Sequence, residues 1–266
     1  MKRDCLPHVI ERAFVRITAQ YRLTLRAFVV LLICLASATP LFAEDVELEL
    51  VLLADASGSV TEAEALFQRE GYGAALTDPA VLDAIAGTAY GAIAVTYVEW
   101  ASTTSVVVDW MKIDGLESAQ LFAGALRRAP RRAFGRNAIG RALLDGKSLI
   151  ETNAFEGWRK VIDFSGDSPN NYYGPPIEAA RAEVIAAGIT INALPILCRF
   201  CDTYLRYPNL DEIYRDRIIG GPGAFVVTAA SEQDLALAIR RKLILEITGT
   251  APKRTFAKNR TPEELQ

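Results

Sequence analysis

Histidine and cysteine are scarce in this chain, and both shortages restrict its chemistry. The 266 residues include one histidine, His8, and four cysteines. A serine nucleophile needs a basic partner, most often histidine, to attack a carbonyl at a useful rate. Structural zinc sites take their ligands mainly from cysteine and histidine. The sequence therefore argues against a Ser–His hydrolase and against a zinc centre.

Basic charge is also not in excess. The chain has 29 Lys and Arg against 32 Asp and Glu, a formal net charge of −3. Binding to a phosphate backbone relies on a dense basic patch, which this sequence lacks. No glycine-rich phosphate loop with its lysine is present either. These shortages argue against nucleic-acid and nucleotide binding, while 51% hydrophobic residues suffice for one globular domain.

The first 43 residues have the pattern of a secretory signal peptide. Arg22 and Arg26 precede the apolar run 27–38, and an acidic pair follows residue 43. The apolar run is shorter than the roughly 20 residues that a membrane-spanning helix needs. We therefore expect a periplasmic or secreted protein with no membrane span after leader cleavage. An uncleaved N-terminal membrane anchor is the less favoured alternative.

Loss of this leader would leave two cysteines in the mature chain. They are Cys198 and Cys201, spaced Cys-x-x-Cys. Neither a second cysteine pair nor a histidine would remain to complete a zinc site. In an oxidising compartment we expect the pair to form a small structural disulfide that fixes one loop. A redox-active pair is the alternative.

Apolar, β-rich runs alternate with helical patterns along the mature chain. At Thr61 and Glu64 the spacing of a capping box marks the start of a helix, which Asp78-Pro79 ends. The short link 101–104 between two strands predicts a hairpin, so one strand should be antiparallel. Strands are predicted at 46–53, 92–100, 105–110, 161–164, 189–197 and 224–228, and further helices at 116–128, 138–150, 177–187, 210–217 and 232–247.

This alternation predicts the fold class. We expect an α/β, doubly wound, mainly parallel sheet with one antiparallel edge strand and helices on both faces. It forms a single domain over residues 44–248, and a polar tail, 249–266, is expected to be disordered. Ligand sites in such sheets lie at the carboxyl ends of the strands.

Polar turns follow two of the predicted strands. The first is Asp55-x-Ser57-x-Ser59, and the second contains Asp167. Because both turns leave the carboxyl ends of strands, we expect their side chains to lie side by side. Carboxylate and hydroxyl oxygens suit a hard cation, Mg²⁺ or else Mn²⁺ or Ca²⁺. Waters or a ligand oxygen must complete an octahedral shell, and the uncharged hydroxyls leave the ion electrophilic towards an incoming carboxylate.

Asp-x-Ser-x-Ser after the first strand resembles the metal-ion-dependent adhesion site of von Willebrand factor A domains. The resemblance covers roughly residues 45–248. The chain is more closely similar to a family of uncharacterised exported bacterial proteins with an A-like fold, through residues 161–167 and 220–225, Lys242-Leu243 and Glu246. It implies that Asp55, Ser57, Ser59 and Asp167 hold the metal. It also implies a non-catalytic domain that engages a protein ligand, whose acidic side chain could complete the metal shell.

One position departs from the A-domain pattern. A domains place a threonine ligand just before an Ile-Gly pair, where this chain has Asn137. An asparagine amide oxygen can bind a hard cation, so we include Asn137 among the predicted ligands. Ser168 also stands where a glycine is usual.

Two alternatives remain open. One is a structural A-like interaction domain whose metal-free site is degenerate. The other is an α/β hydrolase that uses Ser168 or Asp55 as its nucleophile. The interaction domain would keep the A-like fold without the metal. The hydrolase would lack a histidine base in the mature chain. The Arg-rich link 127–136 is interpreted as a solvated surface, with a docking patch for an acidic partner as the alternative.

Overall fold

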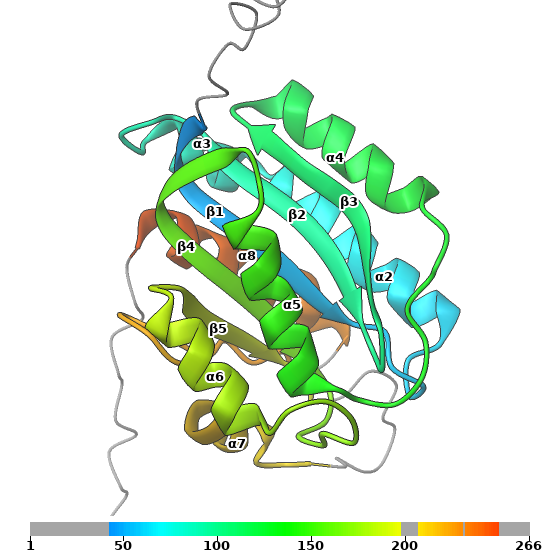
Figure 1. Ribbon diagram of the computed structural model, residues 1–266. Helices are drawn as coiled ribbons and strands as arrows, with labels where there is room; N and C mark the ends of the chain where they lie inside the picture. Colours follow the sequence, from blue (N-terminus) through cyan, green and yellow to red (C-terminus); the bar gives the residue numbers. More distant parts are fainter. Residues whose placement is uncertain (1–42, 198–206, 231, 250–266) are drawn as a thin grey trace, which may run out of the picture. The chain divides into compact units, whose positions relative to one another are not determined.

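A computed structural model describes residues 43–197, 207–230 and 232–249. These residues build a five-stranded sheet in the order β3-β2-β1-β4-β5 (Figure 1). The predicted leader up to residue 42, the Cys198–Cys201 pair and the tail from residue 250 lie outside the described residues. The strands are β1 (Glu44–Asp55), β2 (Ile93–Trp100), β3 (Thr104–Ile113), β4 (Phe155–Gly166) and β5 (Thr190–Pro195).

Strand pairing confirms the predicted sheet. β1 lies at the centre and pairs in parallel with both β2 and β4, and β4 pairs in parallel with β5. β2 and β3 form the expected antiparallel hairpin, which places β3 at the edge. The last eight residues of β1 are all buried, as expected for a strand covered on both faces. The carboxyl ends of β1, β2, β4 and β5 therefore meet at one edge.

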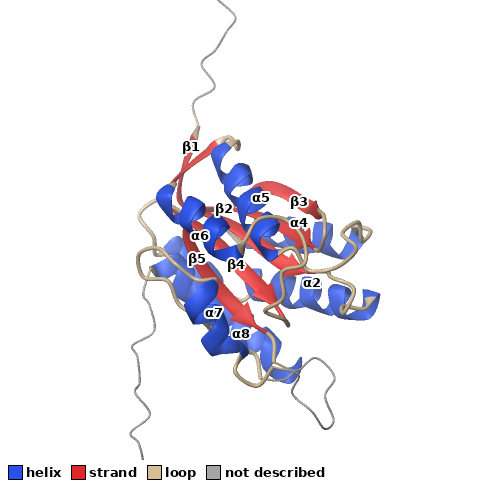
Figure 2. Ribbon diagram, turned by 60° about the horizontal axis from the view of Figure 1, so that its bottom comes forward, coloured by secondary structure: helices blue, strands red, loops and turns tan. Residues whose placement is uncertain are grey.

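Helices cover both faces of the sheet (Figure 2). Buried residues of α2, α3, α4 and α8 belong to one core cluster, and those of α5, α6 and α7 to the other. This confirms the doubly wound α/β class. No helix in the described residues is long and apolar enough to cross a membrane. The helices are α2 (Glu62–Leu76), α3 (Pro79–Ala86), α4 (Leu116–Arg128), α5 (Ile139–Glu151), α6 (Ile177–Ala186), α7 (Leu210–Arg217) and α8 (Glu232–Thr248).

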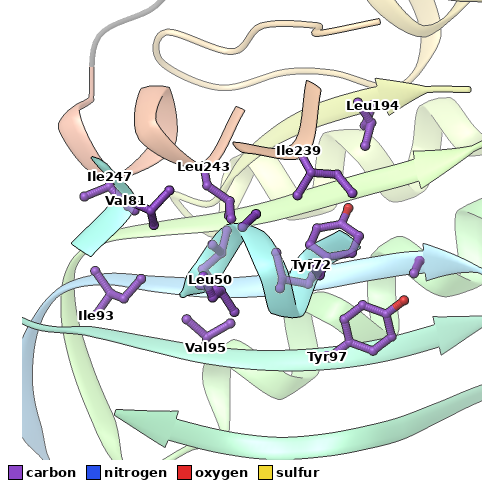
Figure 3. Close-up of a cluster of buried hydrophobic side chains, with 14 of the residues drawn as sticks. Leu50, Tyr72, Val81, Ile93, Val95, Tyr97, Leu194, Ile239, Leu243 and Ile247 are labelled. Carbon is purple, nitrogen blue, oxygen red and sulfur yellow. The ribbon is translucent and has the colours of Figure 1, made fainter. Parts of the chain in front are cut away.

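The core beneath α2 and α8 is apolar near the middle of the sheet. Figure 3 shows Leu50 of β1 among side chains from β2, α3 and α8. Tyr72 and Tyr97 meet there edge to face, with ring centroids 5.4 Å apart. Such an arrangement adds a specific aromatic contact to the burial of apolar area.

The predicted start of α2 is confirmed in detail. Thr61 accepts a hydrogen bond from the backbone N–H of Glu64, and the Glu64 carboxylate accepts one from the backbone N–H of Thr61. This reciprocal pair satisfies two N–H groups that a helix start leaves open.

Two predictions about secondary structure were wrong. Residues 224–228 do not form a strand, and their segment pairs with β5 through isolated bridges. The Phe225 N–H donates to the side chain of Asn192 at 3.1 Å, which takes it out of the ladder. α3 was not expected at all, although Asp78 caps it and Pro79 occupies its first turn. Pro at the first turn starts a helix as readily as it ends one.

Candidate metal centre

Asp55, the last residue of β1, points its carboxylate into the edge of the sheet. It is 1% exposed. Its Oδ1 accepts a hydrogen bond from the Ser57 backbone N–H at 2.8 Å, and its Oδ2 accepts one from the Asp167 N–H at 3.4 Å. The second bond crosses from the loop after β4 to the end of β1. The parallel register of the two strands therefore brings the two predicted aspartates together.

The two serine hydroxyls continue this cluster towards the surface. Ser57 is fully buried, whereas Ser59 is exposed. Their Oγ atoms lie 3.2 Å apart, and Ser59 Oγ donates to Asp167 Oδ1 at 3.5 Å. Four of the five predicted ligands thus form one continuous group that runs from a buried carboxylate to an exposed hydroxyl.

The loop that carries these hydroxyls is held by two polar side chains. Gln68 of α2 donates from Nε2 to the Asp55 carbonyl at 3.2 Å. The Arg131 guanidinium donates to the carbonyls of Val60 at 2.7 Å and Ser57 at 3.2 Å, and also to the carbonyl of Ala56. Arg131 belongs to the link that was predicted to be a solvated surface, and for this residue the prediction was wrong. An arginine whose guanidinium donates hydrogen bonds to loop carbonyls cannot be distinguished from a solvated arginine by sequence.

Gly166 leaves the space in which the Asp55 carboxylate sits. A Cβ at this position would lie 2.8 Å from the Tyr214 hydroxyl, 3.1 Å from Trp100 Cζ2 and 3.3 Å from Asp55 Oδ2. Trp100 is itself fixed, because its Nε1 donates to the Ser165 carbonyl at 3.1 Å. The floor of the site is therefore closely packed, and only glycine fits there without displacement.

Asn137, the fifth predicted ligand, lies on the link between α4 and α5. This link touches the serine loop, since the Gly58 N–H donates to the Gly135 carbonyl at 2.7 Å. Asn137 is 7% exposed, and its Nδ2 has no hydrogen-bond partner in the described residues. A buried polar group in that state calls for a further partner. No hydrogen bond joins the Asn137 side chain to the other four ligands in the described part of the chain.

The donor set fits a hard divalent cation. Two carboxylates, two hydroxyls and one amide offer oxygen atoms, the ligands that Mg²⁺, Mn²⁺ and Ca²⁺ prefer. Among the described residues, no cluster of three or more His, Cys, Asp and Glu side chains is arranged to hold a metal. The five proposed donors are oxygen atoms, whereas structural zinc centres take mainly nitrogen and sulfur ligands.

Ser168 has the contacts of a turn residue. Its Oγ accepts a hydrogen bond from the Asn170 N–H at 3.2 Å, and its carbonyl accepts one from the Tyr214 hydroxyl at 3.0 Å. The only histidine of the sequence, His8, lies outside the described residues. The described part of the chain thus offers Ser168 no imidazole base.

Exposed aromatic and basic side chains border the cluster. Phe134 is 58% exposed, Tyr172 47% and Tyr173 53%. The Tyr172 N–H donates to the Asn137 carbonyl at 2.8 Å, which places this tyrosine next to the site. The Arg136 guanidinium carbon lies 3.6 Å from the centroid of the Tyr172 ring. We call Arg132, Phe134, Arg136, Tyr172 and Tyr173 the rim.

Comparison with solved structures identifies the fold. The fold matches a pilus adhesin, SpaC, from Lactobacillus rhamnosus GG, with a TM-score of 0.54, 14% identity, and coverage of 77% of this chain and 31% of that one. It matches a von Willebrand factor type A protein from Catenulispora acidiphila, with a TM-score of 0.51, 16% identity, and coverage of 76% and 43%. This is a von Willebrand factor A fold.

A third match is proximal thread matrix protein 1 from the mussel byssus, described with a zinc-occupied MIDAS motif. Its TM-score is 0.51 at 17% identity, with coverage of 77% of this chain and 49% of that one. The chain thus spans less than half the length of all three structures. A comparison with curated proteins gives no match.

Residues 45–251 match a family model described as "Protein of unknown function (DUF1194)". The matched segment covers most of the chain, so the protein belongs to this family.

Proposed function

We propose that the protein binds one divalent cation at the β1–β4 edge and uses it to engage a protein ligand without catalysing a reaction. Mg²⁺ is the expected ion, with Mn²⁺ and Ca²⁺ as alternatives. The observation that carries the proposal is the joining of Asp55, Ser57, Ser59 and Asp167 into one group from two adjacent parallel strands. Asn137 would supply the fifth oxygen.

The composition of the shell gives the bound ion its role. Asp55 and Asp167 supply the negative charge, while the hydroxyls of Ser57 and Ser59 supply none. An ion with two charged protein ligands stays open to a third, and Mg²⁺ commonly keeps positions for water or a ligand oxygen. The exposed side of the cluster, at Ser59, is where such an oxygen would enter. A carboxylate of the partner fits that position.

The rim supports an acidic protein as the ligand. Arg132 and Arg136 are exposed and have no ion pair in the described residues. Exposed tyrosine, phenylalanine and arginine are enriched at protein–protein interfaces and supply most of their binding energy. Basic residues around a metal attract an acidic partner and accelerate its association. The A-domain folds of a pilus adhesin and a byssus thread protein agree with an extracellular binding module. Export by the leader and a Cys198–Cys201 disulfide remain part of this proposal.

Calorimetric titration of Mg²⁺, Mn²⁺, Ca²⁺ and Zn²⁺ into the protein tests the metal site. Saturable heat is expected from Mg²⁺ or Mn²⁺, and Asp55→Ala should abolish it because the variant loses the buried carboxylate. Asp83→Ala is the matched control, since it removes an exposed aspartate from α3. No heat from any ion with folded protein would contradict the proposal. It would favour the metal-free interaction domain instead.

Capture of partners in Mg²⁺ and in a chelator tests the use of the metal. A partner that is retained in Mg²⁺, released by the chelator and lost in Asp55→Ala is the expected outcome. A partner that stays bound in the chelator would contradict metal dependence, even if the ion binds. Replacement of both Arg132 and Arg136 by Glu should slow association without changing the heat of metal binding.

A further inference from the structure

A second cluster of charges lies in the core, away from the metal edge. Lys242 of α8 is fully buried, and its Nζ lies 2.6 Å from Asp163 Oδ1 and 2.5 Å from Glu246 Oε1. The Asp163 and Glu246 side chains are 1% and 0% exposed. Asp163 belongs to β4, whereas Lys242 and Glu246 are one turn apart on α8. The cluster therefore joins the sheet to the C-terminal helix.

The surroundings hold these groups in place but satisfy them incompletely. Asn192 of β5 donates from Nδ2 to Glu246 Oε1 at 3.0 Å. The Lys242 Nζ also lies 5.8 Å from the centroid of the Phe225 ring. In the described residues neither Asp163 oxygen makes a hydrogen bond, although Oδ1 is in ion-pair contact with Lys242, and Glu246 Oε2 has no hydrogen-bond partner. Two carboxylates thus share one ammonium in a site without solvent contact, where a fully ionised state is costly.

Burial changes the protonation of both acids in the same direction. Desolvation and the charge of Asp163 raise the pKa of Glu246 to about 7, against the opposing effect of Lys242. Desolvation also raises the pKa of Asp163, although Lys242 opposes the shift. Glu246 is therefore able to give and take a proton near neutral pH, next to an amine and a second carboxyl group.

We propose that Lys242 and Asp163 condense to an intramolecular amide, an isopeptide bond between α8 and β4, with Glu246 as the catalytic acid and base. This is a covalent modification of the domain, and it is independent of the metal site and of the proposed function. The ordinary alternative is a triad that stays ionic.

The step is balanced within the three side chains. Asp163 takes up one proton from the Lys242 ammonium, which leaves a neutral amine beside a neutral carboxyl group, while Glu246 already carries its own proton. The Nζ lone pair forms a bond to Asp163 Cγ, and a Cγ–O bond breaks. Glu246 donates a proton to the departing hydroxyl, which leaves as water, and regains one from the nitrogen. The products are the amide and one water, and no external oxidant, reductant or activating group is needed.

The core favours the amide over the ion pair. Condensation removes one positive and one negative charge from a site where each is costly to bury. It also releases the water product from an apolar region. The amide remains able to hydrogen-bond to the Glu246 carboxyl group and Asn192. Proximity of the amine and carboxyl group replaces the activation that a free amine and acid would need.

Mass spectrometry of the intact, denatured protein tests the proposal directly. The expected mass is lower than that of the mature sequence by one water molecule. Trypsin should fail to cleave after Lys242, and fragmentation should identify a branched peptide that contains both Asp163 and Lys242. A full sequence mass together with cleavage after Lys242 would overturn the proposal and establish an ionic triad.

Variants separate this bond from other dehydrations. Lys242→Met should restore the mass calculated for its sequence, and a persistent loss of water would overturn the proposal. Asp163→Asn should condense with loss of ammonia, so that its final mass equals that of the wild type. Glu246→Gln should retain the full mass or lose water slowly, which a purely structural role of Glu246 would not cause. The wild-type measurement decides the question even where a variant does not fold.

Discussion

β4 carries an acid to each of two polar sites that differ in their surroundings. Asp163 lies inside the strand and faces α8, where Lys242 supplies a cation from the protein itself. Asp167 follows the end of the same strand and joins a group of loop hydroxyls and a second carboxylate that reaches the surface. The position of an acid along a strand thus decides whether its environment is built by core packing or by loops open to solvent.

The comparison also separates two ways of holding a carboxylate. Backbone N–H groups orient the Asp55 carboxylate, and these donors carry no formal charge. A lysine in contact holds Asp163, so the removal of that lysine leaves a charge in the core. Mutations in the two regions should therefore differ mainly in what they do to folding stability.

The largest effect is expected for Lys242→Met. Removal of one member of a buried ion pair costs about 3–5 kcal/mol, because the remaining charge is left without compensation. The same substitution prevents formation of the proposed amide, so a loss of stability is expected from either state of the cluster. Urea unfolding of the variant measures the change.

Lys112→Met is the matched control, since its Nζ contacts Glu44 at a similar distance of 2.7 Å but at the surface. An exposed pair contributes about 0–1 kcal/mol. Equal costs for the two variants would remove the distinction between the core cluster and a surface pair.

A smaller effect is expected for Gly166→Ala at the metal edge. The added methyl group must displace the Tyr214 hydroxyl, Trp100 or Asp55, which costs about 1–3 kcal/mol in a closely packed region. The affinity for Mg²⁺ should fall as well, because the added Cβ would lie 3.3 Å from Asp55 Oδ2 and crowd this carboxylate. Urea unfolding and calorimetry on the same variant measure the two changes.

Gly115→Ala provides the comparison, since a Cβ there meets no atom within 4 Å. This residue precedes α4, and we expect a cost below about 1 kcal/mol and no change in metal affinity. A Gly166→Ala variant with unchanged metal affinity would show that the Asp55 carboxylate does not depend on this packing.

The last effect, and the smallest when it is counted per pH unit, is a slope of stability with pH from Glu246. Its pKa in the folded protein is raised from an ordinary value of 4.5 to about 7, so the folded chain binds more protons than the unfolded chain between these values. This stabilisation is complete below pH 4.5 and is lost as the pH rises through 7. One proton changes stability by at most about 1.4 kcal/mol per pH unit.

Urea midpoints between pH 4.5 and 8 measure this slope, and Glu246→Gln should flatten it. In the ionic triad, burial and then the charge of Asp163 raise the pKa of Glu246, while Lys242 and Asn192 lower it. Identical slopes for the wild type and the glutamine variant would place the proton uptake elsewhere.

Most of the fold could be predicted because periodicity and turn residues indicate strands and helices directly. The hairpin and the capping box were predicted for this reason. Residues 224–228 were mispredicted because the contact that excludes them from the ladder comes from Asn192, some thirty residues away. α3 was missed because Asp78-Pro79 was interpreted only as a helix end.

The ligand residues of the candidate site could be predicted from the sequence, but the residues that hold those ligands in place could not. Asp55 and Asp167 follow strands, and topology alone brings such residues together. Arg131 and Gly166 act through contacts between distant segments, and no local pattern marks them. The buried Lys242 cluster was missed for the same reason. Asp163 lies in a predicted strand, but its partners lie on a helix about eighty positions later.

The link between α4 and α5 has a consequence for the timescale of the metal site. α4 packs on one face of the sheet and α5 on the other, so the link at residues 129–138 passes around the carboxyl edge. Asp55 and Asp167 follow hydrogen-bonded central strands, whose amide protons should exchange only on global unfolding. The link has no ladder of strand hydrogen bonds and is held by loop contacts such as those of Arg131 and Gly135, so we expect it to open at a lower free energy than the strands. Asn137 would then join and leave the shell much faster than the other ligands, and ion release would follow the opening of the link.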